Sequence, residues 1–262
     1  MTVLLTNDDG FGEPGIECLY ETLRKEHEVY VLAPEHNMSG TSALITMFRP
    51  LTLHRKGENR FSLEGSPADC VITAVKSGIF PRMPDIVFSG INADSNLGTD
   101  IIYSGTCAAA RQASLYGIPG VGLSVEKKGG RDCPERSFDF EGMADFALSN
   151  IDKFHSLCGN RLRESEYGEY EYFLNINGAS VKKYEGARFT SLCTRVYNDA
   201  VTVREENGTL TAEIHGGGQI VSLGGKDSDF AVSGSSCVSV SILKTQPEYI
   251  IPDDKTAVAE WK

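Results

Sequence analysis

Two adjacent carboxylates, Asp8 and Asp9, follow the apolar run Val3-Leu4-Leu5 and precede a turn rich in glycine. Neighbouring side chains on a strand point to opposite faces, so both aspartates can reach one ligand only if the chain has left the strand. The glycines that follow indicate that it has. Two carboxylates this close repel each other unless a cation or a shared proton relieves them. The pair predicts a metal site or a general acid/base pair, and two solvated aspartates in a turn are the simpler alternative.

The same turn matches the dinucleotide-binding fingerprint Gly10-x-Gly12-x-x-Gly15, and Glu35 sits where a ribose-binding acid would. This pattern favours an NAD(P)-binding oxidoreductase. Against it, Asp8 and Asp9 put two negative charges where a pyrophosphate would approach, and Pro14 falls where the fingerprint expects a helix to start. A divalent cation on the aspartates removes the charge objection, but it makes the site a metal-phosphate site.

Further polar residues follow other predicted strands. Asn37 and Ser39 come after the second strand, and Asn92 comes after a later one. Ligands bind beyond the carboxyl ends of the strands in open parallel sheets, so Ser39 and Asn92 are expected to meet the aspartate pair over one crevice. Two carboxylates, a hydroxyl and an amide carbonyl suit Mg²⁺ or Mn²⁺. Taken singly, Ser39 and Asn92 are ordinary turn formers and helix caps, and only their joint placement favours a site.

The segments beginning at Asn96 and at Ser104-Gly105-Thr106 lead into an alanine-rich helix. Free backbone amides and the positive end of the helix dipole make such a helix start a ready cradle for phosphate. A plain Ser or Thr N-cap explains the same residues equally well.

Strands and helices alternate in the first part of the chain, which predicts an α/β fold with a mostly parallel sheet. We expect a surface hairpin over 52–63, a single helix over 139–154, and a β-rich extension after residue 177. The predicted division is a catalytic core, 1–177, and an extension with a tail, 178–262, whose final strand near 236–243 returns to the core or to a partner. The predicted elements are strands at 3–6, 29–33, 85–89, 121–125 and 171–176, and helices at 16–26, 66–77, 106–116 and 139–154.

Composition limits the class of protein. The net charge of -11, from 25 Lys+Arg against 36 Asp+Glu, argues against binding to nucleic acid duplexes or anionic membranes. No run approaches the ~20 apolar residues that span a bilayer. Seven scattered cysteines without a Cys-x-x-Cys pair are typical of a reducing compartment. With no basic, apolar leader at Met1, a cytoplasmic location is expected.

Five ordered motifs over the first half of the chain resemble the SurE family of stationary-phase survival proteins, which are metal-dependent 5′/3′-nucleotidases and phosphatases. The motifs are 4–10 (LLTNDDG), 33–40 (APEHNMSG), 65–70 (GSPADC), 89–92 (SGIN) and 103–106 (YSGT). The resemblance implies a Rossmann-like three-layer sandwich with a β-rich C-terminal oligomerisation extension, assembled as a homodimer or homotetramer.

The resemblance also implies the site. Asp8, Asp9, Ser39 and Asn92 would hold one divalent cation per subunit, Mg²⁺ or Mn²⁺, with Asp8 and Asp9 catalytic. Phosphate would be held by Asn96, Ser104, Gly105 and Thr106, with Asn37 nearby. The implied substrates are nucleoside 5′- and 3′-monophosphates, and a non-catalytic nucleotide sensor is the remaining alternative.

One residue departs from the family's pattern. The family usually has glycine two residues after the Asn of its Ser-Gly-Ile-Asn motif, whereas this chain has Asp94. An aspartate tolerates unusual backbone angles, but it adds negative charge beside the predicted site. Asp229 fits a recurring aspartate near the end of the family's chains.

Overall fold

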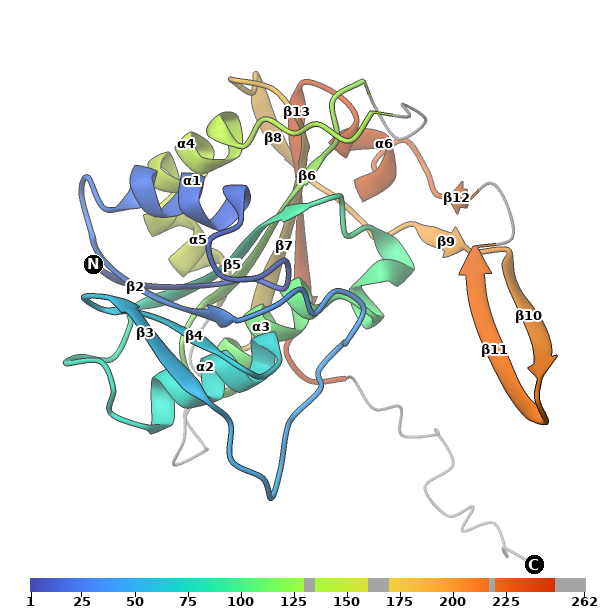
Figure 1. The fold of residues 1–262 in the computed structure, drawn as a ribbon. Helices are drawn as coiled ribbons and strands as arrows, with labels where there is room; N and C mark the ends of the chain where they lie inside the picture. Colours follow the sequence, from blue (N-terminus) through green and yellow to red (C-terminus); the bar gives the residue numbers. More distant parts are fainter. Residues whose placement is uncertain (130–134, 160–169, 217–219, 248–262) are drawn as a thin grey trace, which may run out of the picture.

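The computed structural model describes residues 1–129, 135–159, 170–216 and 220–247. Within these residues, the centre is a nine-stranded sheet with the order β3-β4-β2-β1-β5-β6-β7-β13-β8. Its strands, in chain order, are β1 (Thr2–Thr6), β2 (Glu28–Pro34), β3 (Leu53–Gly57), β4 (Arg60–Leu63), β5 (Ile86–Ala93), β6 (Gly120–Glu126), β7 (Tyr172–Ala179), β8 (Gly186–Phe189) and β13 (Cys237–Lys244). Helices cover both faces, so the fold is the predicted three-layer α/β sandwich with a mostly parallel sheet (Figure 1).

Alternate residues of β1 face the two helix layers. Val3 and Leu5 belong to one buried cluster, and Leu4 belongs to the other. The helices of the first layer are α1 (Pro14–Leu23), α4 (Glu141–Ser149) and α5 (Ile151–Leu157), and those of the second are α2 (Pro67–Lys76) and α3 (Gly105–Leu115). Burying a leucine fully stabilises the fold by about 1.5–3 kcal/mol, so apolar runs such as Val3-Leu4-Leu5 fix their strands in the interior.

The helix predicted over 139–154 is two helices, α4 and α5, so the prediction of one continuous helix was wrong. The chain breaks at Asn150, whose backbone leaves the helical region at φ −123° and ψ 13°. Its side-chain Nδ2 donates to the carbonyl of Phe146 at 2.9 Å. Asparagine competes with helical hydrogen bonds in this way, which ends α4 and lets α5 follow at a new angle.

The hairpin predicted as a surface insertion over 52–63 is instead an edge of the central sheet. Its second strand, β4, pairs in parallel with β2, and β3 pairs antiparallel with β4 outside it. Phe61 and Leu63 are buried because they pack onto the α2 side of the sheet. The alternating pattern was recognised correctly, but its partner strand lies some 30 residues earlier in the chain, and local sequence does not specify that pairing.

The extension adds short strands outside the central sheet. They are β9 (Thr194–Val196), β10 (Asp199–Glu206), β11 (Thr209–Gly216) and β12 (Val221–Leu223), and they are followed by the short helix α6 (Asp229–Ser233). β12 pairs with β9, while β10 and β11 pair only with each other among the described residues. Figure 1 shows this hairpin standing away from the body of the molecule.

The predicted final strand exists and returns to the core. β13 lies between β7 and β8, antiparallel to the first and parallel to the second. Two segments beyond residue 177 are therefore part of the central sheet. None of the helices in the described ranges has the length and apolar character that a membrane span requires. The cysteines in those ranges are free thiols, and Cys133 lies outside them.

Candidate active site

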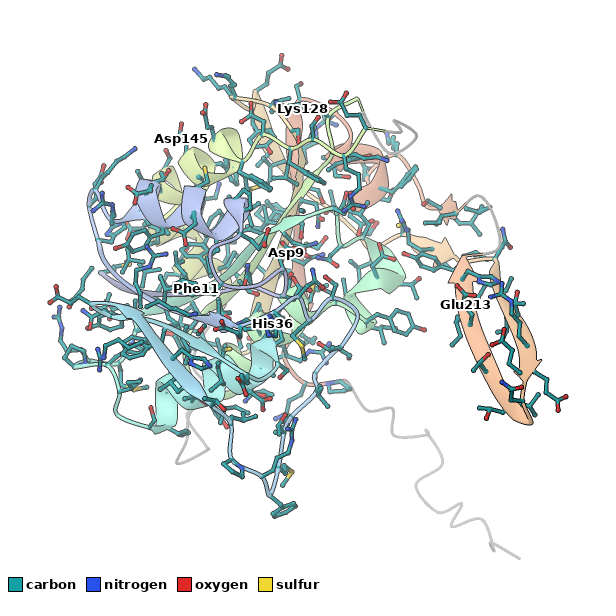
Figure 2. All side chains as sticks on the ribbon, viewed as in Figure 1. Asp9, Phe11, His36, Lys128, Asp145 and Glu213 are labelled. Carbon is teal, nitrogen blue, oxygen red and sulfur yellow. The ribbon has the colours of Figure 1, made fainter. Side chains whose placement is uncertain are left out.

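The loops that follow three parallel strands meet at one edge of the central sheet. Because β1 is flanked by β2 and β5 in parallel, the carboxyl ends of all three strands lie at the same edge. Asp8 and Asp9 follow β1, Ser39 follows β2, and Asn92 lies near the end of β5. The backbone N–H of Met38 donates to the carbonyl of Asp8 at 2.7 Å, which joins the first two loops. Figure 2 labels Asp9 at this edge.

These loops line a cavity of about 1010 Å³, which is large enough for a nucleotide. The predicted site residues that line it are Asp8, Asp9, Asn37, Ser39, Asn92, Asn96 and Ser104. Gly105 and Thr106 lie behind this lining, and a Cβ added to Gly105 would be only 2.9 Å from Asp8 Cβ. The carboxylate pair and the start of α3 therefore come together at one place, although they are about 100 residues apart in sequence.

Asp8 is a buried carboxylate held by the start of α3. Its Oδ1 accepts a hydrogen bond of 2.6 Å from the hydroxyl of Thr106, and its Oδ2 accepts one of 3.3 Å from the Thr106 backbone N–H. Burial raises the pKa of Asp8 above its ordinary value, although the hydrogen bonds from Thr106 oppose this. A buried carboxylate whose pKa is raised in this way gains most from a bound cation.

Asp9 is the more accessible member of the pair. The backbone N–H of Ala93 donates to its Oδ2 at 3.1 Å. Burial, and then the charge of Asp8, raise the pKa of Asp9 to about 7. A divalent cation between the two carboxylates would remove both causes, because it supplies opposite charge and replaces lost solvation.

Ser39 and Asn92 supply neutral oxygens to the same cavity. The Nδ2 of Asn92 donates to the carbonyl of Asp94 at 2.6 Å, which fixes the amide so that its carbonyl oxygen is the atom available to a ligand. Asn37 holds the other loop, because its Oδ1 accepts from the Ser39 backbone N–H at 2.9 Å. Among the described residues, no three His, Cys, Asp or Glu side chains are placed so that they alone could hold a metal ion. The all-oxygen donor set fits a hard cation such as Mg²⁺ or Mn²⁺.

Ser104 is the N-cap of α3 and also faces the cavity. Its Oγ accepts from the backbone N–H of Cys107 at 3.0 Å, as the plain capping alternative predicted. Its hydroxyl hydrogen remains free to donate, because accepting from an N–H uses only a lone pair. The hydroxyl of Thr106 donates to Asp8, and its predicted contact with phosphate stays a prediction. In this structure Thr106 joins the carboxylate pair to the helix start.

The backbone of Asn96 is hydrogen-bonded to two buried asparagines on β7. These two were not among the residues predicted for the site. The Oδ1 of Asn177 accepts from the Asn96 backbone N–H at 2.8 Å, and the Nδ2 atoms of Asn175 and Asn177 donate to its carbonyl at 2.8 and 3.0 Å. The side chain of Asn96 donates to Ser124 Oγ at 3.0 Å. Two asparagines at alternate positions of an apolar strand are an unusual burial pattern, and that signal was present in the sequence.

The dinucleotide fingerprint forms a real strand-turn-helix. Pro14 is the first residue of α1, where proline is favoured, so the objection raised from Pro14 was wrong. Gly15 is required by packing, because a Cβ there would lie 1.9 Å from the carbonyl oxygen of Ile91. Glu35 does not face a ribose site: its carboxylate is bound by Lys56 Nζ at 2.9 Å and by the hydroxyl of Ser62.

Asp94 adopts a glycine-like backbone conformation, with φ at +118°. This is the position where the family usually has glycine, and a side chain there is strained. The carboxylate of Asp94 lies 2.8 Å from Arg136, which also lines the cavity. Its charge also raises the pKa of Asp9, after burial and Asp8.

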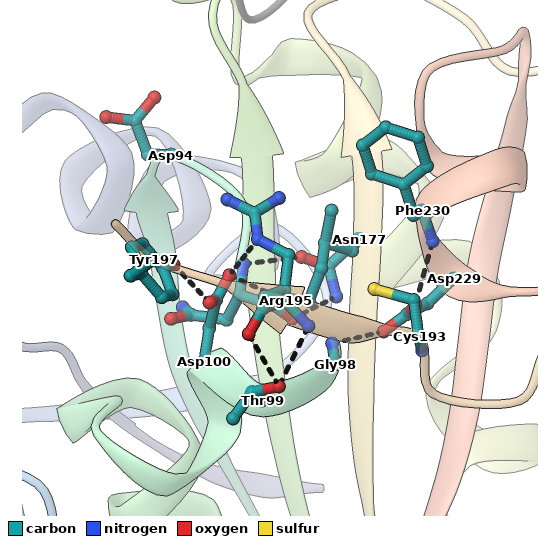
Figure 3. Close-up of polar contacts among 12 residues, drawn as sticks. Asp94, Gly98, Thr99, Asp100, Asn177, Cys193, Arg195, Tyr197, Asp229 and Phe230 are labelled. Atoms are coloured by element: carbon teal, nitrogen blue, oxygen red, sulfur yellow. Dashed lines mark hydrogen bonds and ion pairs between the residues drawn. The ribbon is translucent and has the colours of Figure 1, made fainter. Parts of the chain in front are cut away.

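The extension reaches the cavity through residues that sequence analysis did not place there. Arg195, Tyr197 and Phe230 are among its lining residues. Beside them, Asp229 is completely buried and accepts backbone N–H groups of Gly98 at 2.6 Å and of Cys193 at 2.9 Å (Figure 3). The extension is thus fixed to the segment that leads into α3.

A family model described as "Survival protein SurE" matches residues 3–199 of this chain. A curated relative from Desulfitobacterium hafniense, named 5′-nucleotidase SurE, is 34% identical over 209 residues, covering 78% of this chain and 76% of the relative. Another of that name, from Methylobacillus flagellatus, is 40% identical over 154 residues, or 59% of each chain. A solved structure, described as the Sure protein from Aquifex aeolicus, shares the fold with a TM-score of 0.72 and 28% identity over 94% of both chains.

The matched region contains every residue predicted for the site, from Asp8 to Thr106. The solved structure extends the likeness over most of the extension as well. Sequence, fold and the arrangement of polar residues agree, and this chain belongs to the SurE family.

Proposed function

We propose that this protein is a metal-dependent phosphomonoesterase that hydrolyses nucleoside 5′-monophosphates, with 3′-monophosphates as a second substrate group. As a member of the SurE family it is a phosphoric monoester hydrolase. The observation that supports the proposal most is the link from Thr106 to Asp8, which brings a carboxylate pair and a helix start into one cavity. Metal and phosphate chemistry require those two features together.

Asp8, Asp9, Ser39 and Asn92 would hold one Mg²⁺ or Mn²⁺ ion. When bound, such an ion neutralises phosphate charge and lowers the pKa of a coordinated water. Both oxygens of Asp8 already accept hydrogen bonds from Thr106, so Asp8 is suited to a fixed ligand role and poorly suited to attack phosphorus. Asp9 accepts only one described hydrogen bond, from Ala93, and its second oxygen can take the proton of the attacking water.

The start of α3 would stabilise the phosphate. Ser104 can donate its hydroxyl hydrogen, and it lies at the positive end of the α3 dipole. Asn96 is held rigidly at the cavity wall by Asn175 and Asn177. The base would stack on one of the aromatic rings that line the cavity, Tyr103, Tyr197 or Phe230.

One assay separates this function from its alternatives. Phosphate release is measured from a panel of nucleoside monophosphates with Mg²⁺, Mn²⁺ or chelator, for the wild type, Asp8→Asn and Asp145→Asn. Asp145 is an exposed carboxylate on α4, away from the cavity, and serves as the matched control (Figure 2). We expect release that requires metal, is lost in Asp8→Asn and is kept in Asp145→Asn.

Other outcomes support other functions. Nucleotide binding without release under any metal would support the sensor. A thermal shift with NAD(H) and no release would support the oxidoreductase. If phosphate release is the same with chelator and in Asp8→Asn, the proposed metal site is refuted.

We also propose that the protein is a homodimer or homotetramer, assembled through the β10–β11 hairpin. One face of this hairpin is apolar and exposed, with Val201 at 59% and Ile214 at 76% exposure. These two residues pair directly across the ladder, and Val203 pairs with Ala212 next to them. An isolated two-stranded hairpin is marginal in water, so an uncovered apolar face on one is expected to pack against another copy.

A further inference from the structure

Arg195 belongs to the extension, yet its side chain is inserted into the cavity of the core. It lies in β9, and only 9% of its side chain is exposed. It lines the same cavity as Asp8 and Ser104. Arg136, the other arginine of this lining, is 65% exposed and is paired with Asp94. Arg195 is thus a buried cation in a cavity that is otherwise rich in carboxylates.

The backbone of Arg195 is fixed to the segment that leads into α3. Its N–H donates to Thr99 Oγ1 at 2.9 Å, and the same hydroxyl donates to its carbonyl at 3.3 Å. Thr99 belongs to the 3-10 turn η1 (Gly98–Ile102). The backbone N–H of Ser104 donates to the carbonyl of Asp100 in that turn at 3.0 Å. β9 and the start of α3, which is predicted to bind phosphate, are therefore both hydrogen-bonded to η1.

Asp100 sets the direction of the guanidinium. Its Oδ2 lies 3.4 Å from Arg195 Nε, and it also accepts the Leu97 backbone N–H at 3.1 Å. Its Oδ1 accepts the hydroxyl of Tyr197, whose ring centre is 5.7 Å from the guanidinium carbon. Figure 3 shows the two terminal nitrogens of Arg195 pointing away from Asp100, on the side of Asp94.

An arginine has five N–H donors, and the described polar contacts of the Arg195 guanidinium are with Asp100 and Tyr197. Nε itself has no hydrogen bond of good geometry among the described residues. A buried guanidinium with donors left over requires an acceptor, and a two-pronged donor matches the paired oxygens of a phosphate.

We propose that Arg195 is a substrate-binding residue whose guanidinium holds the phosphate of the nucleotide, so that the extension completes the phosphate site of the core. This rests on the proposed phosphomonoesterase function. Asp100 and Tyr197 are positioning residues, because they orient the guanidinium and leave its terminal N–H groups for the ligand. The metal and the start of α3 would meet other oxygens of the same phosphate.

The test compares Arg195→Gln and Arg195→Lys with the matched control Arg24→Gln, which changes an exposed arginine outside the cavity lining. For each variant we would measure KM and kcat for a nucleoside monophosphate, inhibition by inorganic phosphate, and inhibition by the uncharged nucleoside. In Arg195→Gln we expect KM and the phosphate inhibition constant to rise at least about tenfold, because a charge-assisted, two-pronged contact is lost. The nucleoside inhibition constant should stay unchanged, which a merely structural defect would not produce. The constants of Arg195→Lys should lie between those of Arg195→Gln and the wild type, and Arg24→Gln should resemble the wild type.

Thermal unfolding checks that each variant folds. If Arg195→Gln fails to fold because Asp100 is left unpaired, the double variant Arg195→Gln/Asp100→Asn replaces it. If the wild type releases phosphate and Arg195→Gln has the same KM and the same phosphate inhibition constant, the inference is overturned. The proposed function would then still stand. If the wild type releases no phosphate, the proposed function fails. Calorimetric binding of inorganic phosphate then decides the inference: binding lost in Arg195→Gln supports it, and equal binding overturns it.

Discussion

Thr106 and Asp8, 98 residues apart in sequence, are joined by a hydrogen bond of 2.6 Å from the threonine hydroxyl to Asp8 Oδ1. Both residues are almost fully buried, at 0% and 3% exposure. The first residues of α3 are thereby tied to the carboxylate pair after β1. A change at the helix start is expected to act on the proposed metal site.

We expect Thr106→Val to weaken Mn²⁺ binding by about 10–100-fold, because Asp8 loses the donor that orients it. Valine has the same shape, so the packing of α3 is preserved. Calorimetric titration with Mn²⁺ measures the effect, and Thr106→Ser, which keeps the hydroxyl, should bind almost as the wild type does. Equal affinity in Thr106→Val would show that Asp8 is oriented without this bond.

The stability of the cation-free protein should fall as the pH rises from about 4 to about 7. The folded pKa of Asp9 is about 7, raised by burial and then by Asp8, against an ordinary value of 3.8. Between these pH values Asp9 keeps its proton in the folded protein and has lost it in the unfolded chain. The free energy of unfolding therefore falls as the pH rises. Urea unfolding in chelator across this range measures the slope. Asp9→Asn should reduce the slope of the unfolding free energy against pH, and Asp145→Asn should not. An unchanged slope in Asp9→Asn would show that Asp9 is not the cause of the pH dependence.

Asp94→Gly should stabilise the protein by about 1 kcal/mol, because the backbone at φ +118° is strained for aspartate and free for glycine. The lost ion pair with Arg136 joins two largely exposed side chains and contributes little. The same change removes a charge that raises the pKa of Asp9. Denaturant unfolding measures the gain, with Asp94→Ala as the comparison that removes the charge and keeps the strain. Equal stability of the Gly and Ala variants would argue against backbone strain.

Asp229→Asn should destabilise the protein by about 2–3 kcal/mol, since a carboxylate that accepts several backbone N–H groups is replaced by an amide. The bond to Gly98, at 2.6 Å, is the one most directly affected, because an amide NH₂ cannot accept it. The two segments are in close contact there, since a Cβ added to Gly98 would lie 2.1 Å from the carbonyl oxygen of Cys193. Urea unfolding compares this variant with Asp227→Asn, an exposed neighbour that should be neutral. If Asp229→Asn lowers the free energy of unfolding no more than Asp227→Asn does, Asp229 does not have the role given to it.

Val203→Asp should shift the protein toward the monomer if the apolar face of the β10–β11 hairpin is the contact between copies. Val203 is 61% exposed, so folding of the single chain does not depend on it. Thr211→Asp adds the same charge to the opposite face of the hairpin and should leave the assembly unchanged. Light scattering coupled to gel filtration measures the mass of each. The same mass for all three proteins would exclude this face as the interface.

Local signals predicted much of the fold. A helix was predicted over 66–77, and α2 starts there with a capping box of Ser66 and Asp69, both of whose hydrogen bonds are 3.0 Å long. Such contacts lie within one turn, so the sequence contains all of their information. The meeting of the loops after β1, β2 and β5 followed from the geometry of parallel strands. The roles assigned to those loop residues stay predictions.

Contacts between distant segments escaped prediction. Arg195 meets Thr99 across 96 residues, and Asp229 meets Gly98 across 131. Each depends on how the extension folds back onto the core, which no periodicity encodes. The parallel pairing of β4 with β2 was also missed, because it joins residues as far apart as Val31 and Arg60. The burial of Asn175 and Asn177 was different, because their alternation on an apolar strand could have been read.

Because β13 lies between β7 and β8, this side of the central sheet cannot form without residues 237–244. Until residues 237–244 leave the ribosome, one edge of β7 has no neighbour and β8 has no place in the sheet. The sheet is therefore incomplete on the β7 side until β13 is present, although the strands that carry the carboxylates lie on its other side. A truncation at residue 199, where the family match ends, would expose an unpaired apolar strand and is expected to aggregate. We therefore expect activity to require residues 237–244, which complete this part of the sheet.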